Sequence, residues 1–297
     1  MTKRALSVCS GALFAPLLVT ALLIQAVLAQ DRPGQAWVPS SPPGAEAQRA
    51  LEEMSRLQDE VQRLHFQVRN ETNTAQRVKL QRRLIARRAL FLQARQRAVF
   101  LTNPFVRHSR EVVQALLRQS FPELPSERLS FHPIDSDTTF FNSFFSFSEP
   151  FLKRHRTYHI GINPDLFEGQ SLPPVEGIRG ILCHELAHSL DYQRRTFFGL
   201  WGVLAIFLKS DSNRRFERWA DLQAISRGCG AGLVAYRQWV YQQVSPQERE
   251  RRQHVYLPPQ HIEAVEEVRS NCPSAMSELL QAPPLSLEAI QAAGCSP

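Results

Sequence analysis

Residues 180–192 read GILCHELAHSLDY, and this stretch is the most informative about the fold of the chain. Two histidines, His184 and His188, lie four residues apart, and Glu185 follows the first. Positions i and i+4 of an α-helix share one face, so both imidazoles can reach a single metal ion. Glu185 lies one step round the helix, where it can reach a water on that ion. The alternative is a core helix whose histidines are only hydrogen-bonded.

The surrounding residues predict that this stretch is helical. Pro173 and Pro174 precede it, as prolines often do at the start of a helix, and the helix is predicted to run from Val175 to Tyr192. Its apolar positions can pack into a core while the polar ones face a site, and these positions are Ile178, Ile181, Leu182 and Leu186.

A catalytic zinc site needs a third protein ligand. The sequence after the motif lacks the glycine and third histidine of the metzincins. The segment RRFERWADLQAI (214–225) has helical periodicity and carries Glu217 and Asp221 four residues apart. We predict that Glu217 ligates the ion and that Asp221 accepts the other ring N–H of a ligating histidine. An ordinary charged helix face is the alternative, in which case Asp191 or Asp211 would be the next candidate ligand.

The two motifs HELAH and ERWAD together resemble the gluzincin proteases. They are similar to the branch that contains the HtpX-type membrane proteases, the Oma-type proteases and the prenyl-protein endopeptidases. Asn142-Ser143-Phe144 and RTYHIGIN (156–163) loosely resemble segments that precede the motif in that branch. The resemblance covers residues 138–228. The chain departs from the pattern by Ser143 in place of alanine, by an insert (SEPFLKRHR) and by the lack of full membrane spans between the motifs.

The resemblance implies an α+β, mainly helical, zincin-like metalloprotease domain with a small sheet and one Zn²⁺ per chain. It implies that His184, His188 and Glu217 are the ligands, that Glu185 is the catalytic base and that Asp221 binds His184. The implied activity is endopeptidase cleavage of a protein or peptide substrate. The rival hypothesis is a catalytically silent scaffold that binds a partner protein and holds a structural metal, although such a site has no need of Glu185.

Two further features are expected of the substrate-binding cleft of such a protease. The strand predicted over 156–163 is expected to be an edge strand beside the cleft, where an extended peptide could add to the sheet. A residue that stabilises the oxyanion is also expected, and the candidates are Tyr192, Arg214, His254 and Tyr256.

The first 29 residues predict export. Lys3 and Arg4 precede a long apolar run that ends with small residues at Val27 and Ala29, which is the layout of a signal peptide cleaved after Ala29. An uncleaved membrane anchor is the alternative. Either predicts an exported protein that is periplasmic or associated with the outer face of a membrane.

An exported protein meets an oxidising setting, in which cysteines can form disulfides. Cys272 with Cys295 is the preferred pair, Cys183 with Cys229 is a second pair, and free thiols are the alternative.

Residues 30–44 are rich in Pro, Gly and Ser and predict a linker. Apolar residues then recur at helical spacing over 45–68 and 75–101, which predicts a helical hairpin over 45–101. Acidic residues gather on the first helix and arginines on the second, as suits a packed antiparallel pair. A partner-binding coiled coil and contact of the arginines with anionic lipid are the alternatives. The metalloprotease domain, with a C-terminal helical tail, is expected over 102–297.

Three further patterns bear on partners. The segment FFGLWGVLAIFL (197–208) would be only about 18 Å long as a helix, too short to cross a bilayer, so it predicts either a packed helix or a segment that dips into a membrane. The phenylalanines at 140–147 have the same two interpretations, and burial in the core is the preferred one. The chain has 35 basic and 28 acidic residues, a modest excess that does not predict nucleic-acid binding.

Overall fold

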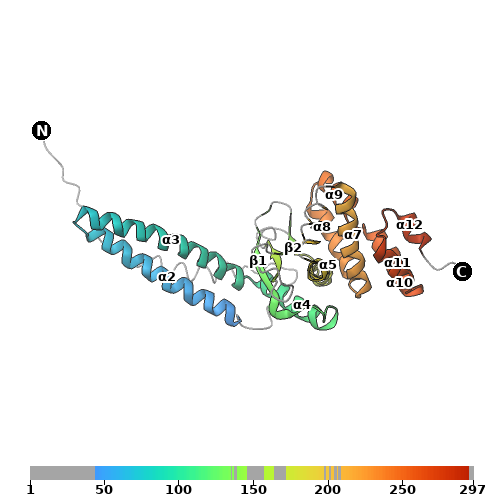
Figure 1. The fold of residues 1–297 in the computed structure, drawn as a ribbon, viewed down its shortest axis with the longest axis horizontal. Coiled ribbons are helices and arrows are strands. Elements are labelled where there is room, and N and C mark those ends of the chain that lie inside the picture. Colours follow the sequence, from blue (N-terminus) through green and yellow to red (C-terminus); the bar gives the residue numbers. More distant parts are fainter. Residues whose placement is uncertain are drawn as a thin grey trace. The chain divides into compact units, whose positions relative to one another are not determined.

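The computed structural model describes residues 44–134, 136, 139–145, 157–163, 172–196, 199–200, 202–203, 206 and 209–293. The predicted signal peptide, almost all of the predicted linker and Cys295 lie outside these residues. The described chain is mainly helical with one three-stranded sheet, which confirms the α+β, mainly helical class (Figure 1).

The first two described helices form an antiparallel pair. Helix α2 spans Ala45–Asn70 and α3 spans Thr74–Thr102, and the two lie side by side (Figure 1). Asn73 starts α3 because its side chain accepts a hydrogen bond from the backbone N–H of Gln76. Two ion pairs join the helices: Arg87 to Glu60 at 3.2 Å and Arg97 to Glu46 at 3.3 Å. Opposite charges therefore meet across the pair as predicted, but only at these two places among the described residues.

Helix α4 spans Pro104–Gln119, and a side-chain cap sets its start. The Asn103 side chain accepts from the N–H groups of Phe105 and Val106, and Pro104 occupies the first turn, where its missing N–H costs nothing. The cap, rather than the apolar periodicity, sets the start of this helix.

The sheet has the order β1-β3-β2, with β1 at Leu129–Pro133, β2 at Phe141–Phe145 and β3 at Tyr158–Ile162. Strand β3 pairs with β1 in parallel and with β2 in antiparallel orientation. The expectation that β3 is an edge strand was therefore wrong. All five of its residues are buried, as expected for a central strand, and β1 and β2 are the edge strands of the described sheet.

Helix α5, Val175–Arg194, packs against α7, Ser210–Ser226, and α8, Gly230–Gln243. The approach to α8 is close because glycines face each other: a Cβ on Gly180 would overlap the backbone of Gly232. The disulfide Cys183–Cys229 also ties α5 to the residue before α8, with Cα atoms 6.4 Å apart. This is the second of the two predicted pairs. Cys272 is disulfide-bonded too, and its predicted pairing with Cys295 stays a prediction.

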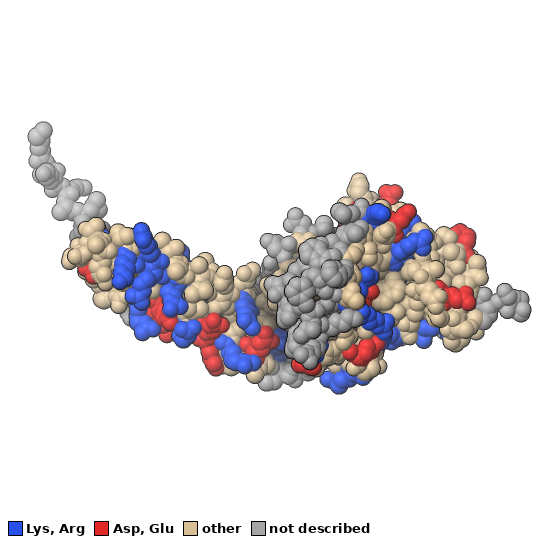
Figure 2. Space-filling model, in the orientation of Figure 1, with Lys and Arg blue, Asp and Glu red and all other residues tan. Residues whose placement is uncertain are grey.

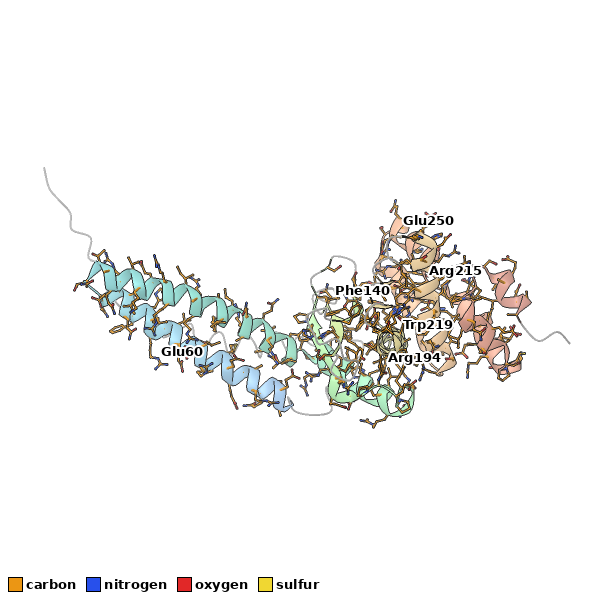
Figure 3. The ribbon with its side chains drawn as sticks, in the orientation of Figure 1. Glu60, Phe140, Arg194, Arg215, Trp219 and Glu250 are labelled. Atoms are coloured by element: carbon orange, nitrogen blue, oxygen red, sulfur yellow. A yellow bond between two sulfur atoms is a disulfide. The ribbon has the colours of Figure 1, made fainter. Side chains whose placement is uncertain are left out.

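Four helices complete the C-terminal part: α9 at Pro246–Val255, α10 at Pro259–Asn271, α11 at Ala275–Gln281 and α12 at Leu287–Ala292. Arginines of α7 hold the segment between the last two. Arg214, Arg215 and Arg218 donate to the backbone carbonyls of Leu285, Pro283 and Pro284 respectively (Figure 3 labels Arg215). The C-terminal segment is thus attached to α7.

Much of the apolar segment 197–208 lies outside the described residues, but Leu200 and Val203 are almost fully buried. They belong to an apolar cluster whose other buried members are Tyr158, Tyr192 and Phe216. This burial agrees with the packed interpretation for those two positions. Within the described ranges, no helix has both the length and the apolar character that a bilayer crossing would require.

Candidate metal centre

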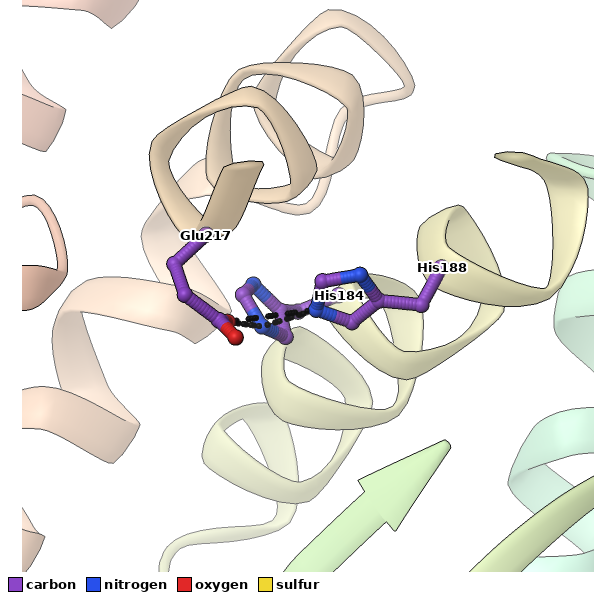
Figure 4. Close-up of side chains that lie close together, drawn as sticks. All are labelled: His184, His188 and Glu217. Atoms are coloured by element: carbon purple, nitrogen blue, oxygen red, sulfur yellow. Dashed lines mark hydrogen bonds and ion pairs between the residues drawn. The ribbon is translucent and has the colours of Figure 1, made fainter. Parts of the chain in front are cut away.

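Three side chains from two helices converge at the centre of the C-terminal part. His184 and His188 come from α5 and Glu217 from α7 (Figure 4). The two Nε2 atoms are 3.1 Å apart, and Glu217 Oε2 is 3.2 Å from each of them. All three residues are buried, and together they could hold a metal ion.

The spacing of the three atoms suits a shared ion. Ligand atoms about 2.0–2.1 Å from a metal at tetrahedral angles lie roughly 3.3 Å apart, and the three separations here are 3.1, 3.2 and 3.2 Å. The set needs two helices, since α5 supplies both imidazoles and α7 supplies the carboxylate. The predicted third ligand, Glu217, therefore lies where the prediction requires it.

Asp221 fixes the orientation of the first imidazole. Its Oδ1 is 2.8 Å from His184 Nδ1, and since a carboxylate only accepts, Nδ1 carries the proton and Nε2 faces His188 and Glu217. The carboxylate is fully buried and accepts two more hydrogen bonds, from the Arg237 guanidinium at 3.0 Å and from the backbone N–H of Leu257 at 2.8 Å. Asp221 therefore joins α5, α7, α8 and the segment after α9.

The second imidazole is held by packing. His188 Nδ1 is buried and has no hydrogen-bond partner among the described residues. The ring lies 4.7 Å from that of Phe216 and stacks at 6.3 Å on that of Tyr192. The two histidines therefore differ in what orients them, one by a carboxylate and the other by aromatic rings.

Electrostatics in the cluster favour a charged carboxylate. Burial raises the pKa of Glu217, but the positive charge and hydrogen bonds of His188 and His184 outweigh it, so this pKa is well below its usual range. Burial lowers the pKa of His184, but the charge and hydrogen bond of Asp221 outweigh it and raise this pKa to about 10. Metal binding at His184 Nε2 would release the proton held there.

Glu185 differs from the other acids of the site. Burial raises its pKa, and the neighbouring imidazoles only partly oppose this. Its side chain lines the same cleft as the three converging residues, and its carboxylate makes no hydrogen bond within the described part of the chain. A carboxylate with a raised pKa and free oxygens is suited to accept and return a proton.

The cleft has a volume of about 440 Å³. Edge strand β2 forms one wall with Phe141–Phe145, and Tyr192 from α5, Phe216 from α7 and Tyr256 from the segment after α9 form others. The cleft therefore lies beside β2 rather than beside the strand predicted over 156–163.

The four candidate oxyanion residues separate into two groups. Arg214 and His254 line a different cavity, of about 630 Å³, between α7, α9 and α10. Tyr192 lines the cleft beside His184 and His188, but its hydroxyl donates to the backbone carbonyl of Ser143 at 3.3 Å. Tyr256 also lines the cleft, and its hydroxyl makes no hydrogen bond among the described residues. The charge of Glu217 and then burial raise the pKa of Tyr256, which keeps the phenol protonated.

Sequence reasoning missed Arg237. It is buried, bonds Asp221, and lies with its guanidinium carbon 4.3 Å from the ring centroid of Tyr256. The sequence feature that could have predicted a buried arginine is its position among the apolar residues of GLVAYRQWVYQQV (232–244). The two alternative candidates for the third ligand do not join the cluster. Asp191 pairs with Arg195, and Asp211 is exposed in the first turn of α7.

No protein-family model, curated protein or solved structure matches this chain. Any function must therefore be argued from the residues of the site.

Proposed function

We propose that this chain is a zinc-dependent endopeptidase of the gluzincin type, with a zincin-like fold, that cleaves exported or membrane-associated proteins. The observation that carries the proposal is the convergence of His184, His188 and Glu217 beside Glu185 in one cleft. Two imidazoles and one carboxylate, with room left for a water or substrate, form a ligand set typical of catalytic zinc.

Zinc bound there would supply Lewis acidity, which acidifies a water and polarises a carbonyl group. The protein's own part begins with Glu185. Its carboxylate accepts a proton from the attacking water and later gives it to the amine nitrogen that leaves when the peptide bond breaks. Asp221 holds the His184 ring so that Nε2 keeps its direction throughout.

The cleft walls suggest how a peptide would lie. An extended substrate would run along β2 and be held mainly through its backbone, so that its carbonyl lies near Glu185 and no particular side chain is required. The hydroxyl of Tyr256 is the proposed donor to the oxygen that becomes negative in the transition state. Arg237, packed on the ring of Tyr256, positions that phenol.

The test compares Glu185→Gln with Glu176→Gln, an exposed glutamate in the first turn of the same helix. Zinc content would be measured by elemental analysis, and activity as cleavage of an unfolded protein such as reduced casein. We expect Glu185→Gln to retain zinc and to lose activity by about 10²–10⁴-fold, the usual contribution of a general base. Glu176→Gln should behave as the wild type.

The same comparison separates the enzyme from the silent scaffold. A wild-type protein that holds zinc but cleaves nothing, or a Glu185→Gln variant as active as the wild type, would refute the mechanism. The predicted export, and the predicted membrane contact through 197–208, depend on residues that largely lie outside the described ranges and remain proposals.

A further inference from the structure

Helix α3 carries an aliphatic stripe on its outer side, made of Val78, Ile85, Leu92 and Val99. The four residues recur every seven positions and are 41, 70, 51 and 56% exposed. Seven residues are almost two helical turns, so residues at this spacing drift only about 20° per repeat and form a narrow line. With a rise of 1.5 Å per residue, the stripe is about 32 Å long. The opposite side of α3 packs on α2 through residues such as Leu80 and Ala94.

Arginines flank the stripe. Arg82, Arg88 and Arg95 lie three or four residues from Ile85 or Leu92, which places them on the same side of the helix. All three are exposed, and none has an ion pair or hydrogen bond among the described residues. They differ in this from Arg87 and Arg97, which pair with glutamates of α2.

The whole helix has one sign of charge. It contains no Asp or Glu, and its basic residues are Arg77, Lys79, Arg82, Arg83, Arg87, Arg88, Arg95 and Arg97. Figure 2 shows Lys and Arg side chains gathered on the hairpin. A straight line of exposed aliphatic side chains between unpaired arginines is the pattern of a helix that lies on an anionic lipid surface.

We propose that the aliphatic stripe of α3 docks on the surface of an anionic membrane, with the helix axis parallel to the bilayer. The aliphatic side chains enter the boundary between headgroups and acyl chains, and the flanking arginines contact lipid phosphates. The proposal is independent of the metal centre and of any catalytic activity.

Charge distinguishes a membrane from the other possible occupants. A second copy of this chain would bring the arginines flanking its own stripe against Arg82, Arg88 and Arg95, and like charges repel. A coiled-coil partner is normally selected by flanking charges of both signs, which set its register, whereas α3 offers one sign along its whole length. A uniformly anionic surface needs no register.

The experiment uses the full chain and a readout local to the stripe. Ile85→Trp and, separately, Leu92→Trp are mixed with vesicles of brominated phosphatidylglycerol and phosphatidylcholine, and tryptophan quenching above that of the wild type is measured. The matched control is Ser55→Trp, exposed on α2. Because quenching requires contact between the indole and the acyl chains, attachment of the protein through another segment does not reproduce it.

We expect quenching at both stripe positions to be at least about twofold greater than at Ser55→Trp, and to fall at high salt, which screens the arginines. Changing Arg82, Arg88 and Arg95 together to Glu should abolish the excess, whereas the same change at the exposed Arg63, Arg69 and Arg249 should not.

Three outcomes overturn the proposal. The first is equal quenching at Ile85→Trp, Leu92→Trp and Ser55→Trp. The second is quenching that is the same in vesicles of phosphatidylcholine alone. The third is a dimer in light scattering that Ile85→Asp dissociates and that excludes vesicles, which would identify a second copy as the occupant.

Discussion

Asp221→Asn tests whether the buried carboxylate behind His184 governs metal affinity. Asp221 accepts from His184 Nδ1, from Arg237 and from the backbone N–H of Leu257. Asparagine keeps the size and one accepting oxygen, but it removes the negative charge that faces His184 and Arg237. Loss of a carboxylate behind a ligating histidine typically weakens metal binding by about 10–100-fold, which corresponds to about 1.4–2.7 kcal/mol.

The assay is zinc affinity, measured by competition with a chromophoric chelator at neutral pH. Asp211→Asn is the matched control, since this aspartate is exposed in the first turn of the same helix. The variant also leaves the buried charge of Arg237 without its partner, and breaking a buried ion pair costs about 3–5 kcal/mol of stability. Thermal unfolding of the metal-free proteins measures this loss of stability separately from the loss of zinc affinity. If Asp221→Asn binds zinc as tightly as Asp211→Asn, the role assigned to Asp221 is wrong.

Four other changes test separate parts of the structure. Tyr256→Phe should lower kcat by about 10²–10³-fold, as loss of one oxyanion donor does, with zinc content unchanged; an unaltered kcat would exclude the phenol. Gly180→Ala should cost about 1–3 kcal/mol in urea unfolding because its Cβ would overlap the backbone of Gly232, and a neutral result would contradict that close approach. Changing Cys183 and Cys229 together to Ser should cost about 2–5 kcal/mol, seen as a lower Tm without reductant, and an unchanged Tm would contradict a stabilising role for this disulfide. Chelation of the metal should lower Tm in the wild type, and added zinc should restore it, but neither should affect Glu217→Ala to the same extent.

Local patterns predicted several of the helices, among them α5 and α7, which carry the candidate site. The helices at 45–70, 74–102 and 175–194 follow from apolar residues at three- and four-residue spacing, which the geometry of a single helix accounts for. The pairing of His184 with His188 is also local, since four residues separate them on one helix. Glu217 and Asp221 were predicted from a second motif on another helix, and the structure places both against His184.

Other features depended on which surfaces meet. The alternation in 156–163 predicts a strand, but only pairing on both sides makes β3 central and leaves β2 at the edge. The cap by Asn103, rather than periodicity, begins α4. Spacing along the chain did not show that Cys183 pairs with Cys229, because it is the approach of α5 to α8 that brings these two residues together.

The amino-acid sequence alone therefore predicted the helical hairpin, the helices that carry HELAH and ERWAD, and the charge of α3, because each of these depends on residues a few positions apart. The tertiary structure decided which tyrosine has a free hydroxyl in the cleft, that Arg237 supports Asp221, and which side of α3 remains exposed. These depend on contacts between segments far apart in the chain. Periodicity indicates that a helix has an apolar side, but only packing determines what, if anything, covers it.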